Sequence, residues 1–584
     1  MRHSGEPRYF LNEIDIFSFA DKEDTADTVF IGKYKFTYNE GDKLPGNYAT
    51  TAADHWGYYN QREYTPADCN RADFYNLRNP NPATMQYGSL RSMTYPTGGT
   101  TVLEYEPHDY SHYISDTRDR LLEKDSIAGG LRIKRITDYE DETCKNVLSS
   151  RTFSYVANGK SSGTLYAKPK YYWPHWAMKT RSGGAVKSAG MAMFRSSSII
   201  PLANALHPHV TYSQVEETNA DGSRNVYKFT DGWTGNDRDE GFFLKYHDTA
   251  TSPYDHFSEK SFARGRIKEK TMYDVAGKLV CRETYKDTLC NDTQKDFVIT
   301  SGVIPFFSGI IAGGLYKLYY QKSRPSSVVR RTVTQAGSIK ETDSWQYKRV
   351  ELDLTSGKKH KGQAFVMTKA WKARMATSVG SMYGYPFESD DSVLRNWTLS
   401  RYFLVPNIEK QFENGSRVKT VDCKYSKVTK GDKMFVAPYM VTVTTTQNVS
   451  DTLVTYLAYT KTGQLQCYRQ AGQPATSLLW GMGDNFLMMK CENLNLSNTD
   501  VVQFERDGFF YMDNVLDIQN KFRNSHSAAL VTSYTYAPTC GVTSMTTPDG
   551  KTIYYNYAPG LRLSEVLNNN SKPLQRYEYN FRNR

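Results

Sequence analysis

The C-terminal part of the chain is built from short runs in which apolar and polar residues alternate. Tyr-x-Tyr pairs occur there at Tyr534/Tyr536, Tyr555/Tyr557 and Tyr577/Tyr579. The second tyrosines lie 21 and then 22 residues apart. Between the pairs, Val542 and Met545 match Leu563 and Val566 at a shift of 21 residues. Alternation with a period of two is typical of half-buried strands, and Gly550 stands in an Asp-Gly pair suited to a hairpin turn. The pattern predicts β hairpins that repeat along the chain.

The same spacing recurs upstream. Aromatic residues follow Gly550 at positions plus five and plus seven, Tyr555 and Tyr557. Tyr227 and Phe229 follow Asp221-Gly222 at these offsets, and Leu103 and Tyr105 follow Thr97-Gly98. Offsets of five and seven have the same parity, so both side chains are expected on one face of the returning strand.

A second recurring element reads Tyr-Asp-x-x-Gly, at Tyr273, Asp274 and Gly277. The segment from Tyr273 to Leu279 resembles the YD repeat of the rearrangement-hotspot (Rhs) family. Four further strings resemble one branch of that family, large exported proteins of Gram-negative bacteria: DHWGYYN (54–60), YPTGGTTVLEYE (95–106), GGLRIKRI (129–136) and LLWG (478–481). The resemblance implies a mainly β fold in which antiparallel YD-repeat hairpins form a spiralling sheet, an open or partial hollow shell with few helices.

We divide the chain into six segments of one continuous repeat architecture. They are an N-terminal β segment (1–158), a long loop excursion (159–198), a YD-like segment (199–296), an apolar segment (297–320), a degenerate β segment (321–450) and C-terminal YD repeats (451–584). A helix is expected near 514–524, because Val515, Ile518 and Phe522 follow helical spacing.

The amino-acid composition agrees with a β-sheet protein and narrows the range of functional classes. The 44 tyrosines and 40 glycines, with only 39% hydrophobic residues, suit pleated surfaces that are half buried. The net charge of +11 is spread along the chain, so no nucleic-acid partner is expected. No catalytic motif, phosphate loop or metal-ligand spacing occurs, so the sequence predicts neither an enzyme nor a cofactor. His207 and His209 could face one side of a strand, but a polar strand edge is the favoured interpretation.

One string offers candidate ligand contacts. The aromatic residues Trp56, Tyr58 and Tyr59 stand beside the polar residues Asp54, His55 and Asn60. Aromatic rings stack on the apolar faces of sugars while carboxylates and amides bind their hydroxyls, so this string is a candidate carbohydrate site. The alternative, which we favour, is that these residues pack within the sheet.

The residues from 297 to 316 carry no charge and are numerous enough to cross a bilayer. Pro305 and several glycines interrupt the run, so a buried pair of strands is the favoured interpretation and membrane insertion the alternative.

The sequence therefore predicts a non-enzymatic scaffold, secreted or on the cell surface, that encloses or displays an effector or an adhesive surface. The alternative is a module that binds a surface glycan through its aromatic patch. The aspartate-containing core segment and the toxin that follow the repeats in many Rhs proteins have no counterpart here. No signal peptide is recognised, and we expect the natural N-terminus to lie further upstream.

Overall fold

The computed structural model describes residues 8–19, 28–46, 50–182, 185–200, 202, 208–234, 242–243, 257–258, 260–289, 297–305, 311–319, 323–353, 361–496, 515–537, 541–558 and 561–577. The described residues lie mostly in strands, which pair almost entirely antiparallel, and few lie in helices, which confirms the mainly β prediction. The chain forms two compact units. Unit 1 comprises Met1–Ile14 and Lys33–Thr342, and unit 2 comprises Asp15–Gly32 and Asp343–Arg584.

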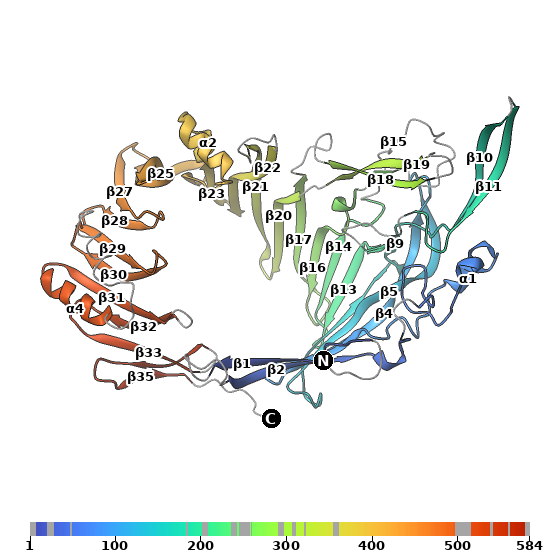
Figure 1. The fold of residues 1–584 in the computed structure, drawn as a ribbon, viewed down its shortest axis with the longest axis horizontal. Helices are drawn as coiled ribbons and strands as arrows, with labels where there is room; N and C mark the ends of the chain where they lie inside the picture. Colours follow the sequence, from blue (N-terminus) through green and yellow to red (C-terminus); the bar gives the residue numbers. More distant parts are fainter. Residues whose placement is uncertain are drawn as a thin grey trace. The chain divides into compact units, whose positions relative to one another are not determined.

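The elements follow one another as shown in Figure 1. Strands with residues in both units are β1 (Glu13–Phe19), β2 (Thr28–Tyr38) and β21 (Gly337–Asp353). Unit 1 contains β3 (Leu90–Thr94), β4 (Thr100–Ile114), β5 (Leu121–Tyr139), β6 (Val147–Ser154), β7 (Val156–Ala157), β8 (Lys160–Ser161), β9 (Gly163–Leu165), β10 (Tyr172–Ser182), β11 (Ala185–Phe194), β12 (Val210–Tyr212), β13 (Gln214–Asn219), β14 (Arg224–Phe229), β15 (Phe242–Phe243), β16 (Ile267–Tyr273), β17 (Leu279–Leu289), β18 (Phe297–Pro305), β19 (Ile311–Tyr319), β20 (Ser323–Thr334) and the helix α1 (Phe74–Leu77).

Unit 2 contains β22 (Lys361–Arg374), β23 (Thr377–Gly384), β24 (Ile408–Glu413), β25 (Ser416–Lys430), β26 (Lys433–Thr445), β27 (Ser450–Tyr459), β28 (Leu465–Gln470), β29 (Ala475–Gly481), β30 (Phe486–Glu492), β31 (Leu530–Ala537), β32 (Gly541–Thr546), β33 (Thr552–Ala558), β34 (Arg562–Leu567), β35 (Pro573–Arg576) and the helices α2 (Ser392–Ser400) and α4 (Val515–Ser525).

Each unit is a ladder of antiparallel strands. In unit 1 the hydrogen-bonded order is β3-β4-β5-β6-β13-β14-β16-β17-β20. A short parallel pairing of β4 with β9 adds a branch, which continues to β12. In unit 2 the strands from β22 to β35 pair in chain order, each with the next. Neighbouring hairpins thus cover one another's edges, which an isolated hairpin could not do.

The 21-residue repeat is confirmed by the strand register. Tyr534 pairs with Met545 and Tyr536 with Val542, and one repeat later Tyr555 pairs with Val566 and Tyr557 with Leu563. In both hairpins a bulge lies immediately before the second tyrosine. A bulge bends its strand away from the neighbour, so the same bend recurs in both hairpins.

The turns of the repeat also form as expected. Asp274 Oδ1 accepts hydrogen bonds from the backbone N–H groups of Ala276 and Lys278, and Gly277 adopts a φ of +76°. Gly550, in the turn between β32 and β33, also has a positive φ, of +82°. Tyr577 follows β35 directly, and Tyr579 lies outside the described residues.

Tyrosine hydroxyls donate hydrogen bonds to backbone carbonyls of the neighbouring strand, just beyond the point where the backbone pairing of the two strands ends. The hydroxyl of Tyr557 donates to the carbonyl of Val542 at 2.8 Å, and that of Tyr536 donates to Leu487 at 2.9 Å. The same contact joins Tyr105 to Leu90, Tyr155 to Ile133, Tyr385 to Met367 and Tyr459 to Pro438. In all of these except Tyr459–Pro438, the tyrosine lies three residues after the last residue of its strand that pairs with the acceptor's strand. The acceptor lies two residues before the partner of that last paired residue. We call this contact the tyrosine clasp.

The tyrosine clasp predicts that two neighbouring tyrosine hydroxyls contribute differently to the stability of the protein. Tyr557→Phe is expected to lower the free energy of unfolding by about 1 kcal/mol, because the carbonyl of Val542 loses its hydroxyl donor. Tyr555→Phe, on the same strand, is the matched control and should change stability by less than half as much. Urea denaturation measures both variants, and equal losses would contradict the clasp.

The predicted helix near 514–524 is confirmed as α4. Its apolar side packs on β29, β30 and β31 in a core of unit 2 that includes Met489, Val515, Phe522 and Val531. Gln519, 1% exposed, donates to the carbonyls of Met488 and Tyr534 and so fixes the helix to two strands. The helix α2 was not predicted.

One predicted segment differs from the structure, and a second has the predicted strands but is less buried than expected. The excursion 159–198, expected to be a loop, contains β9 and the hairpin β10–β11, which Figure 1 shows as a separate two-stranded ribbon. The apolar segment is the predicted pair of strands, since β18 pairs with β19 from Phe297↔Tyr319 to Pro305↔Ile311. It is not wholly buried as predicted, because Val298 is 56% exposed and Ile299 52%. Among the described residues no helix is long and apolar enough to span a bilayer.

Candidate functional site

A cleft of about 630 Å³ lies in unit 1, and we call it the unit-1 cleft. Its walls come from the loop 54–60, from α1 and the turn after it, from β4 and β5, and from β9 with the residues that follow. The side chains that give it its chemistry are those of His55, Trp56, Tyr75, Asn76, Lys124 and Lys168. The DHWGYYN string therefore contributes one wall of a cleft whose other walls come from distant parts of unit 1.

Asp54 organises the loop of this string. It is fully buried, and its Oδ1 accepts the backbone N–H groups of Trp56 at 2.8 Å and Tyr58 at 2.9 Å. Its backbone N–H donates to the carbonyl of Tyr58, which makes the loop a tight turn. Burial raises the pKa of Asp54 to about 6, although its backbone hydrogen bonds act in the opposite direction.

Two of the strings singled out in the sequence meet at this loop. A Cβ atom on Gly129 would overlap Oδ2 of Asp54, and one on Gly130 would lie 3.0 Å from the ring of Tyr58. Gly130 also has a φ of +90°, which a side chain rarely adopts. The glycine pair of GGLRIKRI is thus what allows the DHWGYYN loop to approach β5.

The ring of His55 is held in the wall of the cleft. Its Nδ1 lies 2.8 Å from the hydroxyl of Tyr171, and the two rings stack at 5.7 Å. Arg78 lies behind it, 6% exposed, with its guanidinium on the carbonyls of Asp54 and Ser196. Burial, and secondarily the charge of Arg78, lowers the pKa of His55 to about 4, so this imidazole is neutral at physiological pH.

Trp56 joins the cleft to a second buried cluster. One face of its indole stacks on His209 at 5.1 Å, and the Nε2 of His209 lies 2.6 Å from the carbonyl of Gly129. His108 meets His209 edge to face at 5.4 Å. Burial lowers the pKa of His209 and lowers that of His108 to about 3. The Nε1 of Trp56 has no hydrogen-bond partner among the described residues.

The predicted site residues divide between the cleft and its support. His55 and Trp56 line the cleft. Asp54 and Asn60, predicted as polar contacts to a ligand, are instead fully buried, and Asn60 donates to the carbonyls of Leu77 and Asn79. Tyr58 rests on Gly130, outside the cleft lining, and Tyr59 pairs with Ala53 through an isolated bridge. Packing thus accounts for Asp54 and Asn60, whereas Tyr58 is 39% exposed and Tyr59 is half-buried.

Lys124, Lys168, Tyr75 and Asn76 were not predicted as site residues. Lys124 lies on β5, and Lys168 follows β9 with its Nζ 3.4 Å from the centre of the Tyr113 ring. No local motif marks these lysines, because the parallel pairing of β9 with β4 brings the second of them to the cleft.

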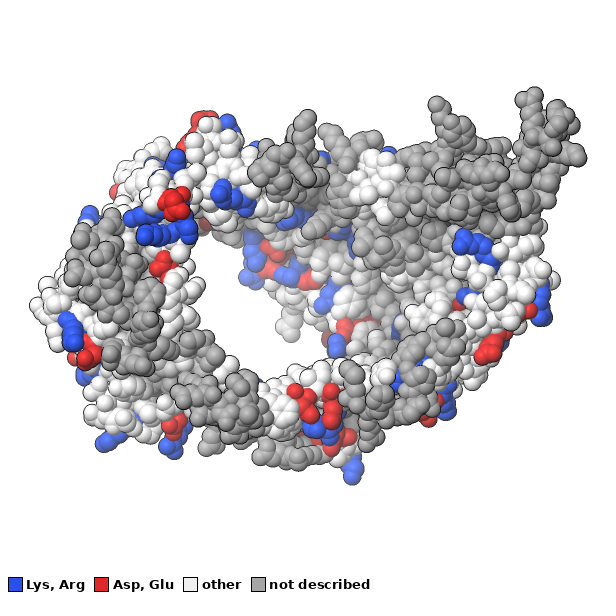
Figure 2. All heavy atoms as spheres, in the orientation of Figure 1, with Lys and Arg blue, Asp and Glu red and all other residues white. Residues whose placement is uncertain are grey.

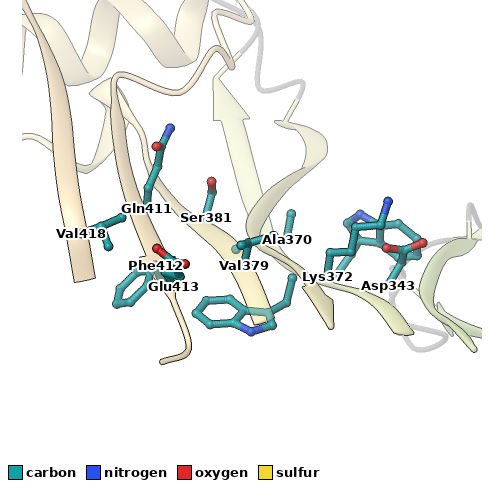
Figure 3. Close-up of a pocket in the computed structure, with 12 residues that line it drawn as sticks. Asp343, Ala370, Lys372, Val379, Ser381, Gln411, Phe412, Glu413 and Val418 are labelled. Carbon is teal, nitrogen blue, oxygen red and sulfur yellow. The ribbon is translucent and has the colours of Figure 1, made fainter. Parts of the chain in front are cut away.

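A second cleft, of about 400 Å³, lies in unit 2 and is lined by residues of β21 to β25. We call it the unit-2 cleft. Its aromatic side chains are Trp345, Trp371 and Phe412, and the last two rings are 5.3 Å apart. Figure 3 shows Lys372 and Asp343 at one end of this cleft, and Phe412 and Glu413 toward the other. Gly380 lies between the two rings in register, and a Cβ there would overlap the indole of Trp371.

Charge is mixed over the visible surface. In Figure 2 basic and acidic side chains of the described residues are interspersed on the face shown. Many form exposed pairs, such as Arg576 with Glu565 and Lys348 with Glu388. Among the described residues, no group of three or more histidine, cysteine, aspartate or glutamate side chains could hold a metal ion.

No protein-family model and no curated protein matches the chain. Solved structures match the chain at low sequence identity. "Crystal Structure of TcdB2-TccC3-Cdc42" is 7% identical over 83% of this chain, with a TM-score of 0.36. "Crystal Structure of TcdB2-TccC3" is 8% identical over 83%, with a TM-score of 0.35. A Tc holotoxin pore of Photorhabdus luminescens is 7% identical over 84%, with a TM-score of 0.28. The chain spans about a quarter of the length of those chains (24%, 25% and 24%).

Proposed function

We propose that the chain is a non-enzymatic scaffold of YD-type hairpins, secreted or on the cell surface, that encloses or displays an effector or an adhesive surface. The observation that carries the proposal is the recurrence of one hairpin design, with the same register, bulge and tyrosine clasp. Stacked repeats of this kind build extended surfaces from nearest-neighbour contacts, which suits a container or a display surface.

Small-angle scattering tests the scaffold. A compact globule of this length should have a radius of gyration of about 25 Å. A sheet that encloses or borders a large space places its mass further from the centre, so the measured value should be clearly larger. A value at the compact figure would contradict a shell. Genes for a toxin and its immunity protein directly downstream would favour an enclosed effector over an adhesive surface.

A second candidate function is carbohydrate binding in the unit-1 cleft. It is favoured by the aromatic side chains of Trp56 and Tyr75 beside the amides of Asn76 and Asn79. Tyr75 is 41% exposed and offers a ring to stack on a sugar, and the two amides can both donate to and accept from hydroxyls.

A further inference from the structure

The balance of charge in the unit-1 cleft is one-sided. Lys124 and Lys168 line it, and no aspartate or glutamate does. The nearest carboxylate on the DHWGYYN loop, that of Asp54, is fully buried and hydrogen-bonded to its own loop. Of the described side chains that line the cleft, a ligand would therefore meet two ammonium groups and no carboxylate.

Neither lysine is neutralised by its surroundings. Among the described residues, no carboxylate lies within ion-pair distance of Lys124 or Lys168. The neighbour of Lys124 on β5, Glu123, pairs instead with Lys160 at 3.6 Å. Lys168 rests on the ring of Tyr113, a contact that holds the ammonium without removing its charge.

The rest of the lining is suited to a sugar ring. Trp56 has one indole face on His209, and its Nε1 is a buried donor that finds no acceptor in the described part of the chain. Asn76, Asn79 and Ser126 add groups that bind hydroxyls, and His55 is held neutral. A donor-rich lining with unpaired cations favours ligands that bring their own negative oxygens.

We infer that the unit-1 cleft binds an acidic saccharide, one whose sugar carries a carboxylate or a sulfate, with Lys124 and Lys168 holding the charged group. This inference rests on carbohydrate binding in the same cleft and names the class of sugar.

The unit-2 cleft provides an internal comparison. It has aromatic side chains as well, but Asp343 and Glu413 line it with one lysine, Lys372. Carboxylates there would repel an acidic sugar, so of the two clefts formed by described residues the unit-1 cleft is the one suited to acidic saccharides.

Calorimetric titration of the full chain with two matched probes tests the inference. A hyaluronan hexasaccharide carries glucuronate in alternation with N-acetylglucosamine, whereas hexa-N-acetylchitohexaose contains only N-acetylglucosamine and no acid. The hyaluronan probe is expected to bind more tightly, and a tenfold rise in NaCl should weaken it, because salt screens the lysines. Lys124→Gln and Lys168→Gln should each lower its affinity about fivefold.

Two further variants are controls. Lys134→Gln removes an exposed charge from the same strand as Lys124 but outside the cleft lining, and should leave affinity unchanged. Lys168→Arg keeps the charge and should retain most of the binding.

Each other outcome overturns a defined statement. Equal affinity for both probes, with no effect of the two glutamine variants, would overturn the acidic class and leave carbohydrate binding intact. Absence of binding to either probe would overturn both. A single-stranded oligonucleotide that binds as tightly as the hyaluronan probe, with the same loss in the variants, would overturn a saccharide in favour of a general anion site.

Discussion

Lowering the pH from 7 to 5 is expected to destabilise unit 1 by about 3 kcal/mol. His55 and His108 are buried as neutral rings, with pKa values lowered to about 4 and about 3. A histidine in the unfolded chain has a pKa of about 6.5, so the unfolded state binds more protons throughout this window. Each of the two histidines then removes about 2 kcal/mol of stability by pH 5, and His209, whose pKa is also lowered, acts in the same direction.

Asp54 opposes this loss. Its pKa is raised to about 6, so between pH 4 and 6 the folded state binds the extra proton and stability rises as the pH falls. The gain is about 1 kcal/mol at pH 5 and does not cancel the histidines. Urea denaturation at the two pH values measures the difference. The double variant His55→Gln, His108→Gln should flatten most of the dependence. A wild-type midpoint that does not move between the two pH values would contradict buried neutral histidines.

Phe74→Ala is expected to cost about 3 to 5 kcal/mol. Phe74 is 1% exposed on α1, and its ring meets Tyr171 edge to face at 5.1 Å and Tyr64 at 5.4 Å. Removal of the ring leaves a cavity behind Tyr171, the residue that positions His55 in the cleft wall. The loss of stability should therefore be accompanied by faster amide exchange across the loop 54–60.

The control for this variant keeps most of the side-chain volume. Phe74→Leu should lose less than half as much stability as Phe74→Ala, because the leucine side chain fills most of the cavity. Hydrogen exchange measured by mass spectrometry reports on the loop in both variants. Unchanged exchange in Phe74→Ala would show that Tyr171 does not depend on this contact.

Local patterns were enough to predict the hairpins of the fold. Alternation and turn residues located the repeats from Tyr534 to Tyr577, because register in a hairpin follows from its turn and its apolar face. The bulges and the clasps were not predicted, since both depend on how a strand leaves one neighbour for the next. The helix α2 was missed although Asp391 caps it, accepting hydrogen bonds from the N–H groups of Val393 and Leu394.

The site was predicted only in part, for a similar reason. The string from Asp54 to Asn60 was recognised as unusual, but its residue types could not show which side chains would turn inward. Asp54 became the anchor of a turn because two backbone N–H groups needed an acceptor there. The lysines that give the cleft its charge lie on β5 and after β9, and only the pairing of strands places them near Trp56.

The tyrosine clasp has a consequence for how such a chain could change over generations. One oxygen atom separates tyrosine from phenylalanine, and one nucleotide separates their codons, so a clasp can be gained or lost without altering the shape of a hairpin. Phe229 occupies the plus-seven position after Gly222, where the ladder continues through a backbone hydrogen bond from Phe229 to Ser213 and leaves no gap to close. Selection could thus adjust the stability of each repeat separately, one hydroxyl at a time.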